Sequence, residues 1–300
     1  MAQGASIEVP GEGLVEPRVF DDRLCALGEG PLWHPDREQL FWVDIVGQKL
    51  RSRKEEKVFE WTFDVPVSAL GWIDHDNLLV AGAGGLMRFN IESGSRETIC
   101  RIEPDRPSLR TNDGRADPKG GFWIGTTGRR AEPGLGTIYR YYRGELRALF
   151  TGIDIPNATC FSPDGEFACF ADSRERIIWR QALDRDGWPT GDRTIFLDLR
   201  QVATSPDGAI FDADGFLWVA CWAKSCVARY TPNGREDLRI ELPVSQITCP
   251  AFGGRNWSTL FVTTAQEGLS AEALAAQPLA GAVFAVETGF RALPDPRVVL

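Results

Sequence analysis

The chain alternates short apolar runs with polar turn segments over most of its length. Six runs each follow a turn and are rich in β-branched and aromatic residues, which is typical of buried strands. Between them, apolar and polar residues alternate around the turn dipeptides SG, RG, DG and NG, so each unit supplies about four strands. The six runs are LFWVD (40–44), NLLVAG (77–82), GFWIGTT (121–127), FACFADS (167–173), FLWVACW (216–222) and TLFVTTA (259–265).

The repeat of these units predicts an all-β fold, a six-bladed β-propeller with four-stranded antiparallel blades around a central channel. We expect one domain over residues 1–300. A fixed offset argues against the alternative, a large β-sandwich: counting back seven positions from each turn residue reaches an equivalent position every time. The turn residues are Asp36, Asp76, Lys119, Asp164, Asp214 and Asn256, and the positions reached are Glu29, Ala69, Asn112, Asn157, Asp207 and Cys249.

The last part of the chain departs from the repeat. The segment EGLSAEALAAQPLA (267–280) is rich in Ala and Leu, and Ser270 stands where an N-cap precedes a short helix. The next segment, GAVFAVE (281–287), reads as a final strand. We expect it to pair with N-terminal strands and close the ring, because closure removes exposed sheet edges.

Composition restricts the partners and the compartment. The chain has 33 Lys and Arg against 42 Asp and Glu, and the net charge of −9 disfavours nucleic acid as a partner. The N-terminal segment has neither the basic nor the apolar region of a signal peptide, and no later stretch approaches the roughly 18 apolar residues of a membrane span. Seven cysteines without CxxC spacing indicate reduced, mostly buried thiols. We therefore expect a cytoplasmic protein without a membrane partner.

Four of the six equivalent positions carry a side-chain oxygen: Glu29, Asn112, Asn157 and Asp207. In a closed ring these oxygens converge on the axis, which would allow a chain with two histidines to build a metal site. Each residue also has a simpler interpretation. Glu29 could be a solvent-facing turn residue, Asn157 a turn amide, and Asp207 a turn former, because its SPDG tetrapeptide also occurs around Asp164.

Segments from five regions of the chain resemble the gluconolactonase family, which includes regucalcin, also called senescence marker protein. Their order and spacing over nearly the whole chain carry the resemblance more than any single motif. The segments are LGEGPLWHPDREQLFWVDI, RTNDGRADPKGGFWIGT, IPNATCFSPDG with FADS, SPDGAIFDADGFLWVACW, and CPAFGG with LFVTTAQEGLS and QPLAGAVFAV. The resemblance implies a six-bladed propeller with one divalent cation at the channel mouth, whose enzymatic members hydrolyse lactones of sugar acids.

The resemblance also implies roles for individual residues. Glu29, Asn157 and Asp207 match metal ligands, whereas Asn112 and Arg110 match residues that contact the substrate. Oxygen donors favour hard cations, Ca²⁺ first, with Mg²⁺, Mn²⁺, Zn²⁺ or Fe²⁺ as alternatives. Asp207 is the expected catalytic base that activates water. Family members often have Gly after the matching Asn, where this chain has Ala158.

A second departure concerns the loop GTTGRRAEPG, which holds Arg129 and Arg130 where a related chain has an acidic pair. This loop is either a solvated segment or a site at which an arginine, Arg130 in our assignment, binds an anionic group on the substrate. The leading hypothesis is a metal-dependent sugar lactonase, a carboxylic-ester hydrolase of carbohydrate metabolism. The alternatives are a cation-binding propeller without catalysis and a related hydrolase of phosphotriesters or non-sugar lactones.

Overall fold

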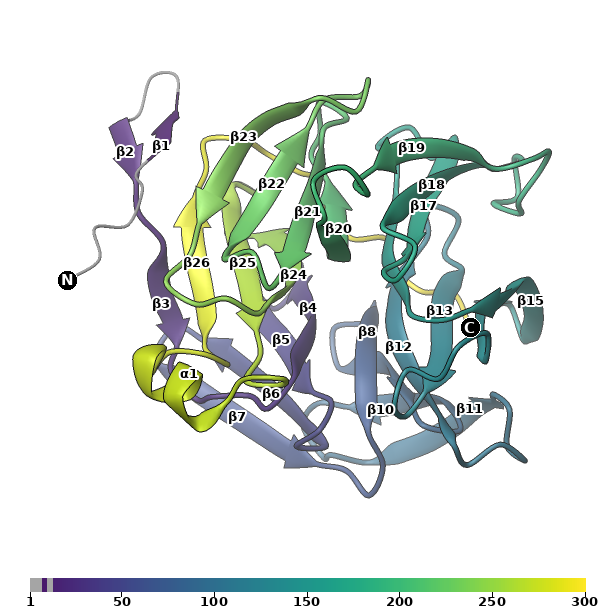
Figure 1. Ribbon diagram of the computed structural model, residues 1–300. Helices are drawn as coiled ribbons and strands as arrows, with labels where there is room; N and C mark the ends of the chain where they lie inside the picture. Colours follow the sequence, from purple (N-terminus) through teal and green to yellow (C-terminus); the bar gives the residue numbers. More distant parts are fainter. Residues whose placement is uncertain (1–6, 10–12) are drawn as a thin grey trace.

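The computed structural model describes residues 7–9 and 13–300, and within them six four-stranded antiparallel sheets form the blades of a β-propeller (Figure 1). The first strands of successive blades pack against one another in ring order, and the last packs against the first. The predicted all-β, six-bladed fold is therefore confirmed.

Each blade runs from an inner strand beside the channel to an outer strand at the rim. The first three consist of β4 (Gly28–His34), β5 (Gln39–Asp44), β6 (Lys49–Lys54) and β7 (Lys57–Thr62); β8 (Val67–Asp74), β9 (Asn77–Gly82), β10 (Gly85–Asn90) and β11 (Arg96–Arg101); and β12 (Leu109–Ala116), β13 (Phe122–Gly128), β14 (Gly136–Tyr142) and β15 (Glu145–Ile153). The last three consist of β16 (Pro156–Phe161), β17 (Phe167–Asp172), β18 (Ile177–Ala182) and β19 (Thr194–Asp198); β20 (Ser205–Phe211), β21 (Leu217–Trp222), β22 (Cys226–Tyr230) and β23 (Glu236–Glu241); and β24 (Ile247–Gly253), β25 (Thr259–Thr264), β26 (Val283–Glu287) and β3 (Arg18–Asp21). A separate hairpin joins β1 (Ile7–Val9) and β2 (Gly13–Val15).

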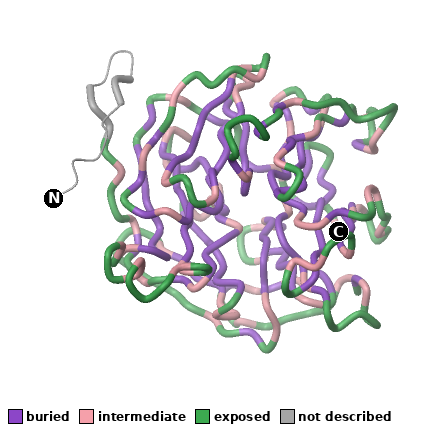
Figure 2. The backbone as a smooth tube through the Cα atoms, viewed as in Figure 1, coloured by how far each residue is buried: buried purple, intermediate pink, exposed green. Residues whose placement is uncertain are grey.

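The six apolar runs form the second strand of each blade. These strands are almost continuously buried because neighbouring blades cover both of their faces, whereas an outer strand such as β7 is mostly exposed (Figure 2). Trp42, Trp123 and Trp218 on the second strands are fully buried. Burial on both faces explains why these segments lack the polar alternation of the hairpins that follow them.

The third strand of the chain, β3, completes the sixth blade. β3 pairs with β26, with Val283 opposite Asp21 and Phe284 opposite Val19, so the predicted closure by the segment 281–287 is confirmed. The predicted short helix is also present as α1 (Ala271–Ala276), and the Ser270 side chain accepts a hydrogen bond from the Ala273 amide. Within the described ranges, no helix is long and apolar enough to cross a membrane.

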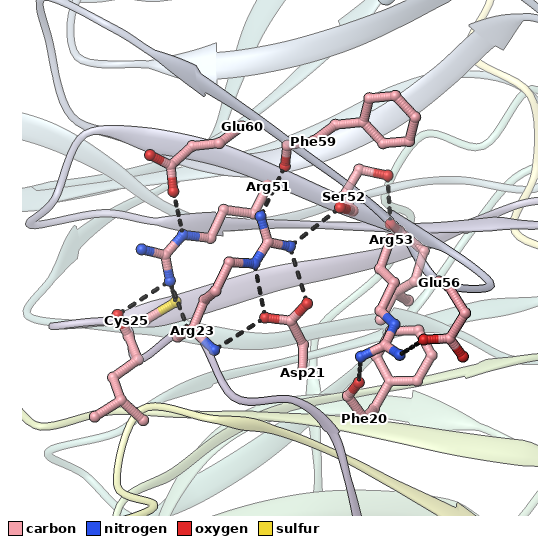
Figure 3. Close-up of polar contacts among 12 residues, drawn as sticks. Phe20, Asp21, Arg23, Cys25, Arg51, Ser52, Arg53, Glu56, Phe59 and Glu60 are labelled. Atoms are coloured by element: carbon pink, nitrogen blue, oxygen red, sulfur yellow. Dashed lines mark hydrogen bonds and ion pairs between the residues drawn. The ribbon is translucent and has the colours of Figure 1, made fainter.

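A polar cluster joins the closing strand to the first blade (Figure 3). Arg51 on β6 donates from Nη1 to the carbonyl oxygens of Arg23 and Leu24, at 2.7 and 3.0 Å, and pairs through Nε with Glu60 at 3.0 Å. Arg23 in turn binds the buried carboxylate of Asp21. Because Arg51 lies on the first blade and its acceptors follow β3, this cluster fixes the two ends of the ring together.

We expect Arg51→Met to lower the free energy of unfolding by about 2 kcal/mol, because it leaves carbonyl groups without their donor while keeping most of the side-chain volume. Thermal and urea unfolding measure the change. Lys49→Met is the matched control, since Lys49 pairs with the same Glu60 at 2.6 Å from a more exposed position. Equal losses in the two variants would contradict a specific role of Arg51 in ring closure.

The C-terminal segment covers one end of the channel. It follows β26 across the turns that end the inner strands: Val298 N donates to Trp72 O at 2.9 Å, and Val299 N donates to Gly120 O at 2.8 Å. Asp295 reaches inward and pairs with Arg115 at 2.8 Å. The positions seven residues before each turn lie at the opposite end of the inner strands, so they face the end that this segment leaves uncovered.

Candidate active site

Each of the six equivalent positions lies where the inner strand of its blade loses register with the second strand. A bulge bends the strand and redirects its side chains, so the common offset of seven residues marks the same structural feature in each blade. The register shifts fall between Glu29 and Leu32, Val67 and Ala69, Thr111 and Gly114, Asn157 and Cys160, Pro206 and Ala209, and Ile247 and Cys249.

The backbone after two of these positions is left-handed. Gly30 has φ of 52° and Ala158 has φ of 55°. For a residue with a side chain this conformation costs about 1–2 kcal/mol of folding free energy. The Ala158 methyl group is fully buried, and this burial offsets about 0.8 kcal/mol of that cost. The Asp113 carboxylate also holds this bulge by accepting a hydrogen bond from Thr159 N at 2.6 Å. These contacts explain how alanine occupies a position that favours glycine.

All six residues assigned to the site from the sequence line one cavity of about 520 Å³ at the uncovered end of the channel. They come from the inner strands of the first, third, fourth and fifth blades, which are β4, β12, β16 and β20, and from the loop after β13. They are Glu29, Arg110, Asn112, Arg130, Asn157 and Asp207. The other two equivalent positions, Ala69 and Cys249, are buried in the wall of the ring.

Asp207 and Asp164 lie in identical SPDG tetrapeptides but occupy different positions in their blades, as the residues that follow each tetrapeptide predict. Asp164 lies in the turn between β16 and β17 and accepts hydrogen bonds from Ser162 Oγ and Glu166 N. Asp207 lies inside β20, at the opposite end of that strand from its turn. The same tetrapeptide therefore forms an ordinary turn in one blade and part of the cavity wall in the next.

A chain of hydrogen bonds fixes the two amide side chains. Arg110 Nη1 donates to Asn112 Oδ1 at 2.6 Å, and Asn112 Nδ2 donates to Asn157 Oδ1 at 2.7 Å. Asn157 Nδ2 then donates to Ser173 Oγ at 2.8 Å, and Ser173 Oγ donates to Pro206 O at 2.6 Å. The chain links the third, fourth and fifth blades and ends beside Asp207, so both amides are held in one orientation.

Two carboxylates of the cavity are buried close to like charges. Glu29 and Asp207 are each 7% exposed. Burial, and then the charge of Asp113, raises the pKa of Glu29 to about 8. Burial and the charge of Glu29 raise the pKa of Asp207 well above its ordinary value. Across the described part of the chain, no ion pair reaches either carboxylate, and the Glu29 carboxylate accepts a hydrogen bond from its neighbour Gly30 N.

This donor set fits a hard divalent cation. Two buried carboxylates that form no ion pair are costly, and a cation between them removes that cost. Glu29, Asp207 and the Asn157 amide oxygen are oxygen donors of the kind that Ca²⁺ and Mg²⁺ prefer. In residues 7–9 and 13–300, no group of three or more His, Cys, Asp or Glu side chains is arranged to hold a metal, so a site here depends on the neutral amide as its third donor.

Several cavity residues were not identified from the sequence. Ser173 belongs to the FADS segment, but its bond to Asn157 depends on the arrangement of β16 and β17. Arg174 and Arg176 lie in the turn after β17, and Glu267 follows β25. Turn residues of this kind show no periodic signal, so nothing in the sequence separates them from ordinary solvated turns.

The fold and the cavity define a class of protein, a six-bladed propeller with a carboxylate-bearing site at one mouth of its channel. The chain belongs to the SMP-30/gluconolactonase/LRE-like family, whose model matches residues 27–266. The predicted family is thereby confirmed, and so is the prediction of an enzyme of the lactone-hydrolase class, because curated relatives are lactonases.

Three relatives show how far the similarity extends. The chain is 37% identical to L-arabinolactonase of Azospirillum brasilense, over 90% of this chain and 91% of the relative. It is 31% identical to 6-deoxy-6-sulfogluconolactonase of Pseudomonas putida, over 90% and 94%. The crystal structure of regucalcin from Agrobacterium tumefaciens, named a calcium-binding protein, superposes with a TM-score of 0.93 at 36% identity and covers 95% of this chain and 98% of that one.

Proposed function

We propose that this protein hydrolyses a sugar-acid lactone to the free sugar acid with the help of one divalent cation. The observation that carries this proposal is the convergence of Glu29, Asn157 and Asp207 with the Arg110 and Asn112 pair in one cavity. Relatives named L-arabinolactonase and 6-deoxy-6-sulfogluconolactonase support a sugar lactone as the substrate. Regucalcin, a calcium-binding structural neighbour, supports Ca²⁺ as the first choice of cation.

Glu29, Asn157 and Asp207 would hold the cation. When bound, it supplies a Lewis acid that polarises the lactone carbonyl and offsets charge on its oxygen. Asp207 takes a proton from a water molecule as the water oxygen bonds to the carbonyl carbon. The bond between the carbonyl carbon and the ring oxygen then breaks, and the ring oxygen leaves as a hydroxyl group with the proton that Asp207 took from water. One lactone and one water thus give one sugar acid.

Arg110 and Asn112 have the role of positioning the sugar. Arg110 already bonds to the Asn112 side chain at 2.6 Å, and Asn112 to Asn157 at 2.7 Å, so substrate contacts and the proposed cation ligands form one connected set. A preorganised set lowers the entropy cost of bringing water and carbonyl together. A protein that only binds a cation has no need for this pair, which argues against the non-catalytic alternative.

The character of the cavity wall favours sugars over apolar esters. Arginine, asparagine, serine and threonine side chains from several blades line it beside aliphatic ones such as Leu27 and Ile155, and Trp222 is its one aromatic residue among those described. Hydroxyl groups of a sugar can exchange hydrogen bonds with such a wall, whereas a non-sugar lactone or a phosphotriester needs more apolar surface. The arginines also favour a lactone that bears an anionic group.

We place the reaction in the cytoplasm, because all seven cysteines are free thiols.

The test follows acid release from a panel of sugar lactones by protein stripped of metal and then supplied with one divalent ion at a time. Spontaneous hydrolysis is subtracted from each rate. The proposal predicts turnover that depends on the restored ion. If the protein binds an ion but hydrolyses no lactone faster than the spontaneous rate with any ion, the lactonase function is refuted. The cation-binding propeller without catalysis then remains.

A further inference from the structure

The charge of the cavity wall is opposite to the charge of the protein. The whole chain carries a net charge of −9, but five arginines line this cavity against three carboxylates. Two of the carboxylates, Glu29 and Asp207, are the proposed cation ligands, so a bound cation makes the cavity more positive still. The arginines are Arg110, Arg129, Arg130, Arg174 and Arg176.

The positive side chains also lie on one side of the cavity. Arg110 and the loop after β13 belong to the third blade, and Arg174 and Arg176 lie in the turn between β17 and β18 of the fourth. The other wall, from the fifth, sixth and first blades, contributes Trp222, Glu267 and Leu27. A substrate is therefore presented with a cationic wall on one side and with an acidic and apolar wall on the other.

Contacts with the protein occupy three of the five arginines. Arg129 Nε donates to Pro107 O at 2.9 Å. Arg174 pairs with Asp154 at 3.1 Å and donates to Ala131 O at 2.7 Å, which clamps the loop after β13 onto the fourth blade. Arg110 bonds to Asn112. These bonds position the cavity wall. They occupy some of the N–H donors of those three guanidinium groups.

Arg130 and Arg176 differ from the others. Within residues 7–9 and 13–300, neither guanidinium group has a hydrogen bond or an ion pair with the protein, although the backbone of each is fixed. Arg130 N donates to Glu132 Oε2 at 3.1 Å, and Arg176 N donates to Asp172 O at 3.2 Å. Arg176 also has φ of 58°, a conformation that a residue with a side chain adopts where its surroundings hold it.

We propose that Arg130 and Arg176 form a subsite that selects a lactone with an oxyanion substituent, a carboxylate, phosphate or sulfonate, on the end of the molecule away from the lactone carbonyl. The subsite rests on the proposed lactonase function and adds the substrate class to it. Guanidinium groups bind such oxyanions through paired hydrogen bonds, and two forks from neighbouring blades can hold one anion from both sides. Glu132 beside Arg130 keeps its loop in place without occupying the guanidinium group.

The test compares two lactones of the same ring and stereochemistry, gluconolactone and 6-phosphogluconolactone, with the 6-sulfonate and the corresponding aldarolactone as further arms to identify the anion. The wild-type protein is expected to favour at least one charged lactone by about tenfold or more in kcat/KM. In the double variant Arg130→Ala/Arg176→Ala, kcat/KM on the charged lactone should fall about tenfold or more further than kcat/KM on gluconolactone, so that the preference is lost. The double control Arg185→Ala/Arg255→Ala removes two charges as well, from exposed turns outside the cavity, and should change neither rate.

A binding measurement separates this proposal from the lactonase itself. Calorimetry on the metal-loaded protein compares gluconate with 6-phosphogluconate, the 6-sulfonate acid and the aldarate, each of which has a second anionic group. Tighter binding of an acid with a second anionic group, lost in the double variant, supports the subsite even if no lactone is hydrolysed. Equal binding of gluconate and all three of these acids, or an equal loss of rate on neutral and charged lactones in the double variant, would overturn it while leaving a neutral-sugar lactonase intact.

Discussion

Asp207→Asn is expected to lower kcat for lactone hydrolysis by about 10²- to 10⁴-fold, the range typical of a lost general base. The amide keeps an oxygen for the cation but accepts no proton from water at neutral pH. Rates are measured at saturating cation, and cation binding is measured separately by calorimetry, because the variant also weakens a proposed ligand. A lower kcat in the metal-loaded variant is then due to the lost proton transfer and not to a lost cation.

The chain supplies its own control for this variant. Asp164→Asn makes the same change in the same SPDG tetrapeptide, but in a turn where the carboxylate accepts hydrogen bonds from Ser162 and Glu166. We expect a small loss of stability and unchanged kcat. Unchanged kcat in Asp207→Asn would remove Asp207 from the role of base, and an equal loss in both variants would assign the effect to the fold.

Glu29→Gln is expected to weaken cation binding by about 100-fold or more, because a buried charge that attracts the cation is lost. Added Ca²⁺ or Mn²⁺ should raise the melting temperature of the wild-type protein, since a ligand that binds only the folded state stabilises it. The same concentrations should leave Glu29→Gln nearly unchanged. Glu267→Gln is the control: it removes a charge from the exposed wall of the same cavity and should keep the response to cation.

The cation-free proteins should differ in their response to pH. In the folded protein the pKa of Glu29 is about 8, against an ordinary value of 4.5. A raised folded-state pKa means that stability from this group is complete below pH 4.5 and declines as pH rises through 8. Cation-free Glu29→Gln should therefore lose less stability between pH 5 and pH 8 than the wild type does. Parallel curves for the two proteins would contradict the assignment of Glu29 as a buried carboxylate that forms no ion pair.

The offset of seven residues allowed much of the site to be predicted, because it follows from a repeated structural feature. Every inner strand bulges at the same distance from its turn, so Glu29, Asn112, Asn157 and Asp207 are brought to one cavity, as the sequence indicates. The closure by β26 was predictable for a related reason, because an isolated apolar strand needs a partner. The roles assigned to these residues remain predictions.

The parts that were not predicted depend on contacts between blades. Ser173 becomes important because its hydroxyl group lies between the Asn157 amide and the Pro206 carbonyl, a donor and an acceptor from different inner strands. Arg174 and Arg176 enter the cavity from a turn whose residues resemble those of any exposed hairpin. Arg129 is held by the Pro107 carbonyl, whereas the Arg130 guanidinium has no such contact in the described part of the chain. That difference depends on neighbours that only the folded chain brings close.

We propose that Glu29, Asn157 and Asp207 hold one divalent cation at the mouth of the channel. The most direct test is an anomalous difference map from crystals of this protein grown with Mn²⁺, collected beside crystals of Glu29→Gln under the same conditions. We expect one strong peak among these three side chains in the wild type and its loss in the variant. A peak at another place in the channel, or none at a Mn²⁺ concentration that supports turnover, would contradict it.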